Sequence, residues 1–156
     1  MKTAFKYLIV ISLLITMVYG CKKGGSTPVP IPDTTNPTIS ITQPTAGQEF
    51  VSGNAITFKA TFADNDNLKS YDIAISKVLA TGFVLKNVPT PVAWIYTKPS
   101  ASFTSGVKQQ DINLSDIIIP MDITGSPVAT GDYNFKVTCI DGSGNSTSTT
   151  IIIKIK

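Results

Sequence analysis

Hydrophobic and polar residues alternate in short runs through most of the chain after residue 37. In the runs 55–63 and 131–140, every second residue is apolar and the residues between them are mostly polar. This period of two is typical of a β-strand with one buried face. The residues predicted to face the core in these two runs are Ile56, Phe58, Ala60, Phe62, Tyr133, Phe135, Val137 and Cys139.

Seven such runs are separated by Gly, Asn, Asp and Pro, and no window carries a helical stripe. They predict strands at 38–43, 55–63, 68–78, 91–97, 109–119, 131–140 and 146–155. This number and spacing of strands favours an all-β fold, an immunoglobulin-like antiparallel β-sandwich of about seven strands. We expect this domain to span residues 37–156.

The first 36 residues have a different pattern. Lys2 and Lys6 lie close to the start of the chain. An apolar stretch follows at 8–18, and the small residue Gly20 precedes Cys21. This is the layout of a secretory signal peptide, and the apolar stretch is shorter than the roughly 20 residues of a membrane-spanning helix. We therefore predict a signal peptide at 1–20 and a Pro/Gly-rich tether at 21–36.

The sequence Val-Tyr-Gly-Cys at 18–21 resembles the lipobox of bacterial lipoproteins. The resemblance implies that Cys21 is acylated and holds the protein to a membrane. Tyr19 departs from the small residue that is usual at its position, so the processing enzyme would need a loose specificity. The alternative is a plain secreted protein in which Cys21 has no such role.

The charged residues limit the possible functions. All 13 basic residues are lysines, and the chain has neither arginine nor histidine. This composition excludes a histidine-dependent hydrolase, a zinc site of the usual kind and an arginine clamp. The formal net charge of +3 comes with no clustered basic face, so we expect no nucleic-acid partner. We predict that the protein is not an enzyme and has no catalytic residues.

The stretch GDYNFKVTCIDGSGNSTSTTIII at 131–153 resembles the last hairpin of bacterial Ig-like and cadherin-like modules. Together with the lipobox and tether, it makes the chain similar to an uncharacterised family of Ig-like lipoproteins of the Bacteroidetes type. The resemblance implies a tyrosine corner at Tyr133 and attachment to the outer membrane. Lysines and glycines rather than acidic residues follow Cys21, which favours the periplasmic face over the cell surface.

Asp64 and Asp66 lie close together in the predicted loop between the strands 55–63 and 68–78. The stretch Ala63 to Asp66 resembles the sequence after the second strand of cadherin-like domains, where aspartates help to bind calcium. In an Ig-like sandwich this loop lies at the same end as Asp33 and Asp141, and oxygen ligands suit Ca²⁺. We therefore name Asp33, Asp64, Asp66 and Asp141 as candidate calcium ligands. Asp and Asn are also ordinary turn formers, and the pattern alone favours this second explanation.

Two aromatic residues in the middle of the chain, Trp94 and Tyr96, are candidate ligand contacts, because exposed aromatics often anchor partners. The alternative, which we favour for Trp94, is that it packs between the sheets.

The sequence thus predicts a non-enzymatic lipoprotein of the cell envelope whose Ig-like domain binds a protein or glycan partner, with no cofactor. The alternative is a calcium-dependent adhesion or carbohydrate-binding module.

Overall fold

The computed structural model describes residues 31–78 and 91–156. Residues 32–156 belong to one compact unit, to which the description below refers. Every regular element within the described ranges is a strand. In the same ranges, no helix is long and apolar enough to cross a membrane.

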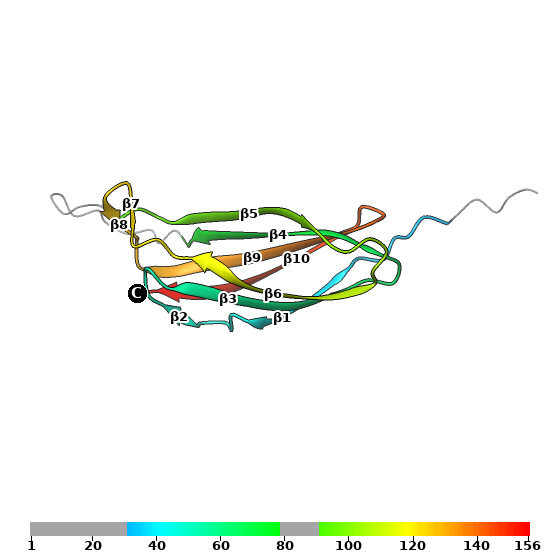
Figure 1. The fold of residues 1–156 in the computed structure, drawn as a ribbon, viewed down its shortest axis with the longest axis horizontal. Coiled ribbons are helices and arrows are strands. Elements are labelled where there is room, and N and C mark those ends of the chain that lie inside the picture. Colours follow the sequence, from blue (N-terminus) through cyan, green and yellow to red (C-terminus); the bar gives the residue numbers. More distant parts are fainter. Residues whose placement is uncertain (1–30, 79–90) are drawn as a thin grey trace, which may run out of the picture. The chain divides into compact units, whose positions relative to one another are not determined.

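The described part of the chain contains ten strands (Figure 1). They are β1 (Thr38–Gln43), β2 (Glu49–Phe50), β3 (Ala55–Ala63), β4 (Leu68–Lys77), β5 (Ile95–Ser102), β6 (Gln109–Ile118), β7 (Asp122–Ile123), β8 (Ser126–Pro127), β9 (Gly131–Asp141) and β10 (Ser146–Ile155).

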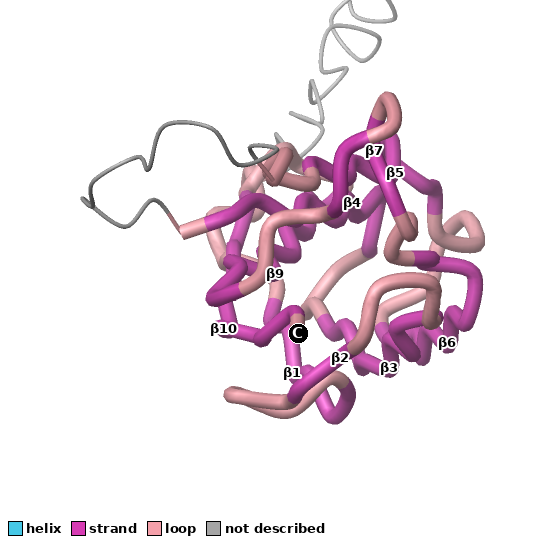
Figure 2. The backbone as a smooth tube through the Cα atoms, turned by 90° about the vertical axis from the view of Figure 1, so that its left-hand side faces the viewer, coloured by secondary structure: helices cyan, strands magenta, loops and turns pink. Residues whose placement is uncertain are grey.

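The strands form two facing sheets and one small hairpin. One sheet has the order β1-β3-β6, the other has the order β2-β10-β9-β4-β5, and β7 pairs with β8. The long neighbouring strands are antiparallel, whereas the short β2 runs parallel to β10. The two sheets enclose a common interior (Figure 2). The predicted all-β, Ig-like sandwich is confirmed.

The core forms where the inward-facing residues of the two sheets meet. All eight residues predicted to face inward from β3 and β9 are at most 3% exposed. Phe58 and Phe135 stack across the interior with ring centroids 5.7 Å apart. Because one face of each strand is apolar, burial of that face fixes the register of the sheets.

One predicted strand is placed differently. The pattern predicts a strand at 91–97, fourth in order, whereas the structure has β5 at Ile95–Ser102. This strand pairs with β4 and forms the edge of the larger sheet. Trp94, just before it, is 5% exposed, and Val92 makes an isolated bridge to Val128. Residues 79–90, which precede this segment, lie outside the described residues.

The predicted tyrosine corner is confirmed at Tyr133 in β9. Its hydroxyl donates a hydrogen bond of 2.6 Å to the carbonyl oxygen of Ala129, four residues upstream. It also accepts a bond of 3.3 Å from the backbone N–H of Trp94. Burial raises the pKa of Tyr133, so the hydroxyl stays protonated and able to donate. These bonds connect β9 to the chain segments before β5 and before β9 itself.

Replacing Tyr133 with phenylalanine is expected to lower the free energy of unfolding by about 1–3 kcal/mol, because it leaves buried backbone groups without partners. Urea unfolding followed by circular dichroism measures the loss. A Tyr71→Phe variant is a matched control, since Tyr71 is 5% exposed and its hydroxyl makes no hydrogen bond among the described residues. Equal stability of the Tyr133 variant and wild type would contradict the assigned role.

Candidate metal centre

Asp64 lies in the connection between β3 and β4 and shapes the turn there. Its Oδ2 accepts hydrogen bonds of 2.9 Å from the backbone N–H groups of Asp66 and Asn67. This is the way Asp side chains ordinarily stabilise a turn. The other oxygen, Oδ1, is buried and has no hydrogen-bond partner within residues 31–78 and 91–156. The turn therefore uses one oxygen of Asp64 and leaves the second one free.

Asp141 ends β9 and fixes the turn to β10. It is 1% exposed, and each of its oxygens accepts one hydrogen bond of 2.7 Å from Asn145. Oδ1 takes the backbone N–H and Oδ2 takes the side-chain amide. A carboxylate oxygen can accept more than one bond, so each of them keeps a free lone pair.

Asp33 lies before β1, next to the β3–β4 turn with Asp64 and the β9–β10 turn with Asp141. Its Oδ1 accepts a bond of 3.0 Å from the N–H of Thr35, and its carbonyl oxygen accepts one of 3.1 Å from Nδ2 of Asn145. The Thr35 N–H and the nearby Asn65 side chain hold the pKa of Asp33 below its ordinary value. Its Oδ2 is nevertheless buried and accepts no hydrogen bond of good geometry.

These three aspartates form one cluster at the end of the sandwich where β3 meets β4 and β9 meets β10 (Figure 1). One oxygen from each carboxylate lies within 4.8 Å of the others. Ca²⁺ holds oxygens at 2.3–2.6 Å, so two ligands of one ion can be up to about 5 Å apart. The three oxygens are therefore close enough to contact a single Ca²⁺ ion.

The buried, unpaired oxygens are an observation separate from the clustering. Buried polar groups in proteins are nearly always hydrogen-bonded, and buried charges are paired or bind metals. Among the described residues, Asp64 Oδ1 has neither a hydrogen bond nor an ion pair, and Asp33 Oδ2 accepts no hydrogen bond of good geometry and forms no ion pair. Turn formation accounts for the other oxygen of each residue, but it does not account for these two.

The remaining predicted site residues are not part of the cluster. Asp66 is exposed, and its Oδ2 accepts a bond of 2.8 Å from Asn67 Nδ2 instead. Trp94 is buried between Tyr96 and Tyr133, so its ring is not available as a surface contact. Tyr96 is partly buried. Cys21 lies outside the described residues.

Asn145 is a site residue that the sequence did not single out. It binds the side chain of Asp141 and the backbone of Asp33 at once, and so connects the last turn with the N-terminal segment. In the sequence it is one of several Gly, Ser and Asn residues of a predicted turn. Only the fold reveals that its side chain reaches residue 33.

Cys139 lies on β9 just inside the cluster and is fully buried. Burial raises the pKa of its thiol to about 12, and the negative charges of Asp64 and Asp141 add to the effect. The thiolate is the reactive form of cysteine, so this thiol is held in its inert form at neutral pH. The prediction that Cys139 is a core residue is confirmed.

In a chain with Cys21 replaced by serine, we expect Cys139 to resist thiol reagents such as dithionitrobenzoate at pH 8 in the folded protein and to react once the protein is unfolded in urea. The release of thionitrobenzoate, followed by absorbance, measures both states. Rapid reaction of the folded chain would show that the thiol is accessible or that its pKa is low.

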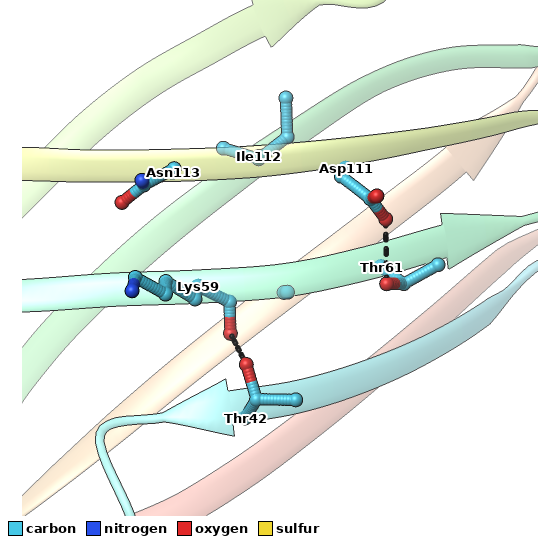
Figure 3. A pocket seen from close by; sticks show the side chains of 7 residues that line it. Thr42, Lys59, Thr61, Asp111, Ile112 and Asn113 are labelled. Atoms are coloured by element: carbon cyan, nitrogen blue, oxygen red, sulfur yellow. Dashed lines mark hydrogen bonds between the residues drawn. The ribbon is translucent and has the colours of Figure 1, made fainter.

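A second feature is a hollow of about 230 Å³ over the β1-β3-β6 sheet. Figure 3 shows Thr61 donating a hydrogen bond to Asp111 and Thr42 donating one to the carbonyl oxygen of Lys59. The hollow offers hydroxyl, amide and charged groups, and the described residues that line it include no aromatic ring. It has hydrogen-bonding capacity but no stacking surface.

The chain belongs to the family described as Domain of unknown function (DUF4625), whose model matches residues 20–156. No curated protein matches the chain.

Solved structures with a similar arrangement include the fibronectin(III)-like modules of Clostridium thermocellum CbhA, with 16% identity and a TM-score of 0.43 over 76% of this chain and 46% of that one. Spo0M, a sporulation control protein from Bacillus subtilis, has 13% identity and a TM-score of 0.46 over 78% and 49%. A beta-glucosidase from Listeria innocua has 11% identity and a TM-score of 0.36 over 77% and 16%. The chain spans less than half the length of each.

Proposed function

We propose that this protein is a non-enzymatic module of the bacterial cell envelope that binds Ca²⁺ at Asp33, Asp64 and Asp141, and that its Ig-like domain binds a protein or glycan partner. The observation that carries the calcium proposal is the cluster of three carboxylates with two buried, unpaired oxygens. A cation at this place would neutralise the repulsion among the three charges and would give both oxygens a partner.

Calcium is the ion that suits the cluster best. All of the ligand atoms are carboxylate oxygens, and the thiol of Cys139 on β9 is held protonated. Ca²⁺ accepts six to eight oxygens in a tolerant geometry, so backbone carbonyls and water would complete the shell. Mg²⁺ requires a tighter octahedron with oxygens at 2.0–2.1 Å, which places opposite ligands only about 4.2 Å apart.

Thermal unfolding tests the calcium proposal. A ligand that binds only the folded state stabilises it, by about 2.7 kcal/mol when its free concentration is 100 times the Kd. We expect the Tm in millimolar CaCl₂ to exceed the Tm in EDTA by several degrees and MgCl₂ at equal concentration to have a smaller effect. An identical Tm in CaCl₂ and EDTA would rule out the site.

The attachment to the envelope is proposed from the sequence around Cys21. Acylation of this residue would leave the domain outside the bilayer at the end of its tether, and several acyl chains on one residue anchor firmly. We propose the periplasmic face of the outer membrane, in a lipoprotein of the Bacteroidetes type. Metabolic labelling with a palmitate analogue should mark the wild-type chain and leave a Cys21→Ser variant unlabelled.

The partner can be sought in the native envelope. Crosslinking of the tagged protein in intact cells, with and without added calcium chelator, should recover an envelope protein or a glycan-bearing component. Capture that depends on calcium would favour an adhesion role, and capture that does not depend on it would assign the ion a structural role. Proteinase treatment of the same cells reports which membrane face carries the domain.

A further inference from the structure

The sheets hold two of the three proposed ligands in place more firmly than the third. Asp64 and Asp141 lie in turns whose neighbouring strands are held by sheet hydrogen bonds on both sides. Asp33 lies ahead of β1, and the residues beside it, Pro32, Thr34, Thr35 and Asn36, are exposed. The next buried residue is Pro37.

The contacts that hold the segment 32–36 to the sandwich converge on Asp33. Its carbonyl oxygen accepts the amide of Asn145, and its carboxylate points toward those of Asp64 and Asp141. Without a cation, the amide of Asn145 and the side chain of Asn65 hold Asp33 beside the two other carboxylates. A hydrogen bond contributes little net stability in water, because it replaces bonds to the solvent, so the segment is held only weakly.

A bound cation would attract all three carboxylates. Asp33 would then be a ligand that joins the segment to both turns. Since Asp64 and Asp141 are fixed by their strands, the charge repulsion that returns when the ion leaves is relieved most readily by movement of Asp33. The cluster is therefore built so that one of its three ligands can leave while the fold stays intact.

We propose that Ca²⁺ decides whether the segment 33–36 is docked on the sandwich or free, so that the ion sets the point at which the domain is attached to its tether. This inference rests on the proposed calcium site. Release would move the attachment point from Asp33 to Pro37 and would add about 14 Å of extended chain to the reach of the domain.

Docking of the segment and binding of calcium are thermodynamically linked. If calcium favours docking of the segment, docking must strengthen calcium binding by the same factor, and such couplings are typically about 5–150-fold. An Asp33→Asn variant should therefore bind calcium more weakly by a factor in this range while keeping a residual affinity through Asp64 and Asp141.

A nitroxide spin label on a Thr34→Cys variant tests the inference in the full chain purified in detergent. Cys139 is buried and unreactive, so with Cys21 replaced by serine the label should attach at position 34 alone. In CaCl₂ the spectrum is expected to shift from the mobile to the immobilised component, and EDTA should reverse the shift. A label on a Thr150→Cys variant, at an exposed position of β10, is the control and should not respond.

Calorimetry on the same labelled sample separates the two proposals. If calcium binds and the spectrum at position 34 stays mobile, the docking inference is overturned and the calcium site stands. If no binding is detected, both are overturned. Adding Asp33→Asn to the labelled variant should leave the label mobile even when calcium saturates the remaining ligands, and immobilisation in that variant would contradict the assigned role of Asp33.

Discussion

An Asp64→Asn variant is expected to lose the stabilisation by calcium while remaining at least as stable as wild type in EDTA. The asparagine oxygen can still accept the hydrogen bonds from Asp66 and Asn67 that shape the turn. Its amide replaces the unpaired Oδ1, so it removes a negative charge from the cluster and offers a donor to Asp33 or Asp141. Without an ion this change relieves repulsion, and with calcium it removes a ligand.

The two chains should therefore exchange their order of stability when calcium is added. At 100 times its Kd, calcium should raise the stability of wild type by about 2.7 kcal/mol, or roughly 10 °C in Tm for a domain of this size. Differential scanning fluorimetry in CaCl₂ and in EDTA measures both chains.

Asp66→Asn is the matched control, since Asp66 lies two residues away and outside the cluster. It should respond to calcium as wild type does. A calcium response that persists in Asp64→Asn and disappears in Asp66→Asn would show that the wrong aspartate has been assigned to the site.

Replacing Phe135 with alanine is expected to lower the free energy of unfolding by about 3–5 kcal/mol, the usual loss for a buried phenylalanine. Phe135 is fully buried in β9, between β4 and β10, and stacks on Phe58 of the opposite sheet. Its removal would open a cavity where the two sheets meet, which the strands on either side cannot readily close. Urea unfolding measures the change.

The exposed neighbour Lys136 provides the control, because a Lys136→Ala substitution should change stability by no more than about 0.5 kcal/mol. In a double-mutant cycle, Phe58→Ala and Phe135→Ala should be non-additive, because each removes the other's partner. A loss below about 1 kcal/mol for Phe135→Ala alone would contradict the core described above.

Alternation along single strands was sufficient to predict most of the fold. In β3 and β9 one face is fully buried and the other meets water, so every second residue carries the signal. At β5 the signal fails, because the strand is at an edge, contains Pro99 and has no fully buried residue. The two-residue strands β2, β7 and β8 are too short to produce a period.

The site could be predicted in part because topology gathers loops that are distant in the sequence. The Ig-like connectivity predicts that the turns after β3 and β9 lie near the start of β1, and the structure places Asp33, Asp64 and Asp141 together there. Asp66 could not be separated from Asp64 by sequence, since both are turn formers. The conformation of the turn separates the two residues. Asp64 Oδ2 accepts the N–H of Asp66, and the side chain of Asp66 accepts a hydrogen bond from Asn67 instead of joining the cluster.

Isothermal titration of the full chain with CaCl₂ tests the central claim most directly. We predict one Ca²⁺ bound per chain, with an affinity that falls in Asp64→Asn and Asp141→Asn and is unchanged in Asp66→Asn. The absence of a binding signal at millimolar calcium, or a signal that survives loss of both Asp64 and Asp141, would contradict the claim that these carboxylates form a calcium site.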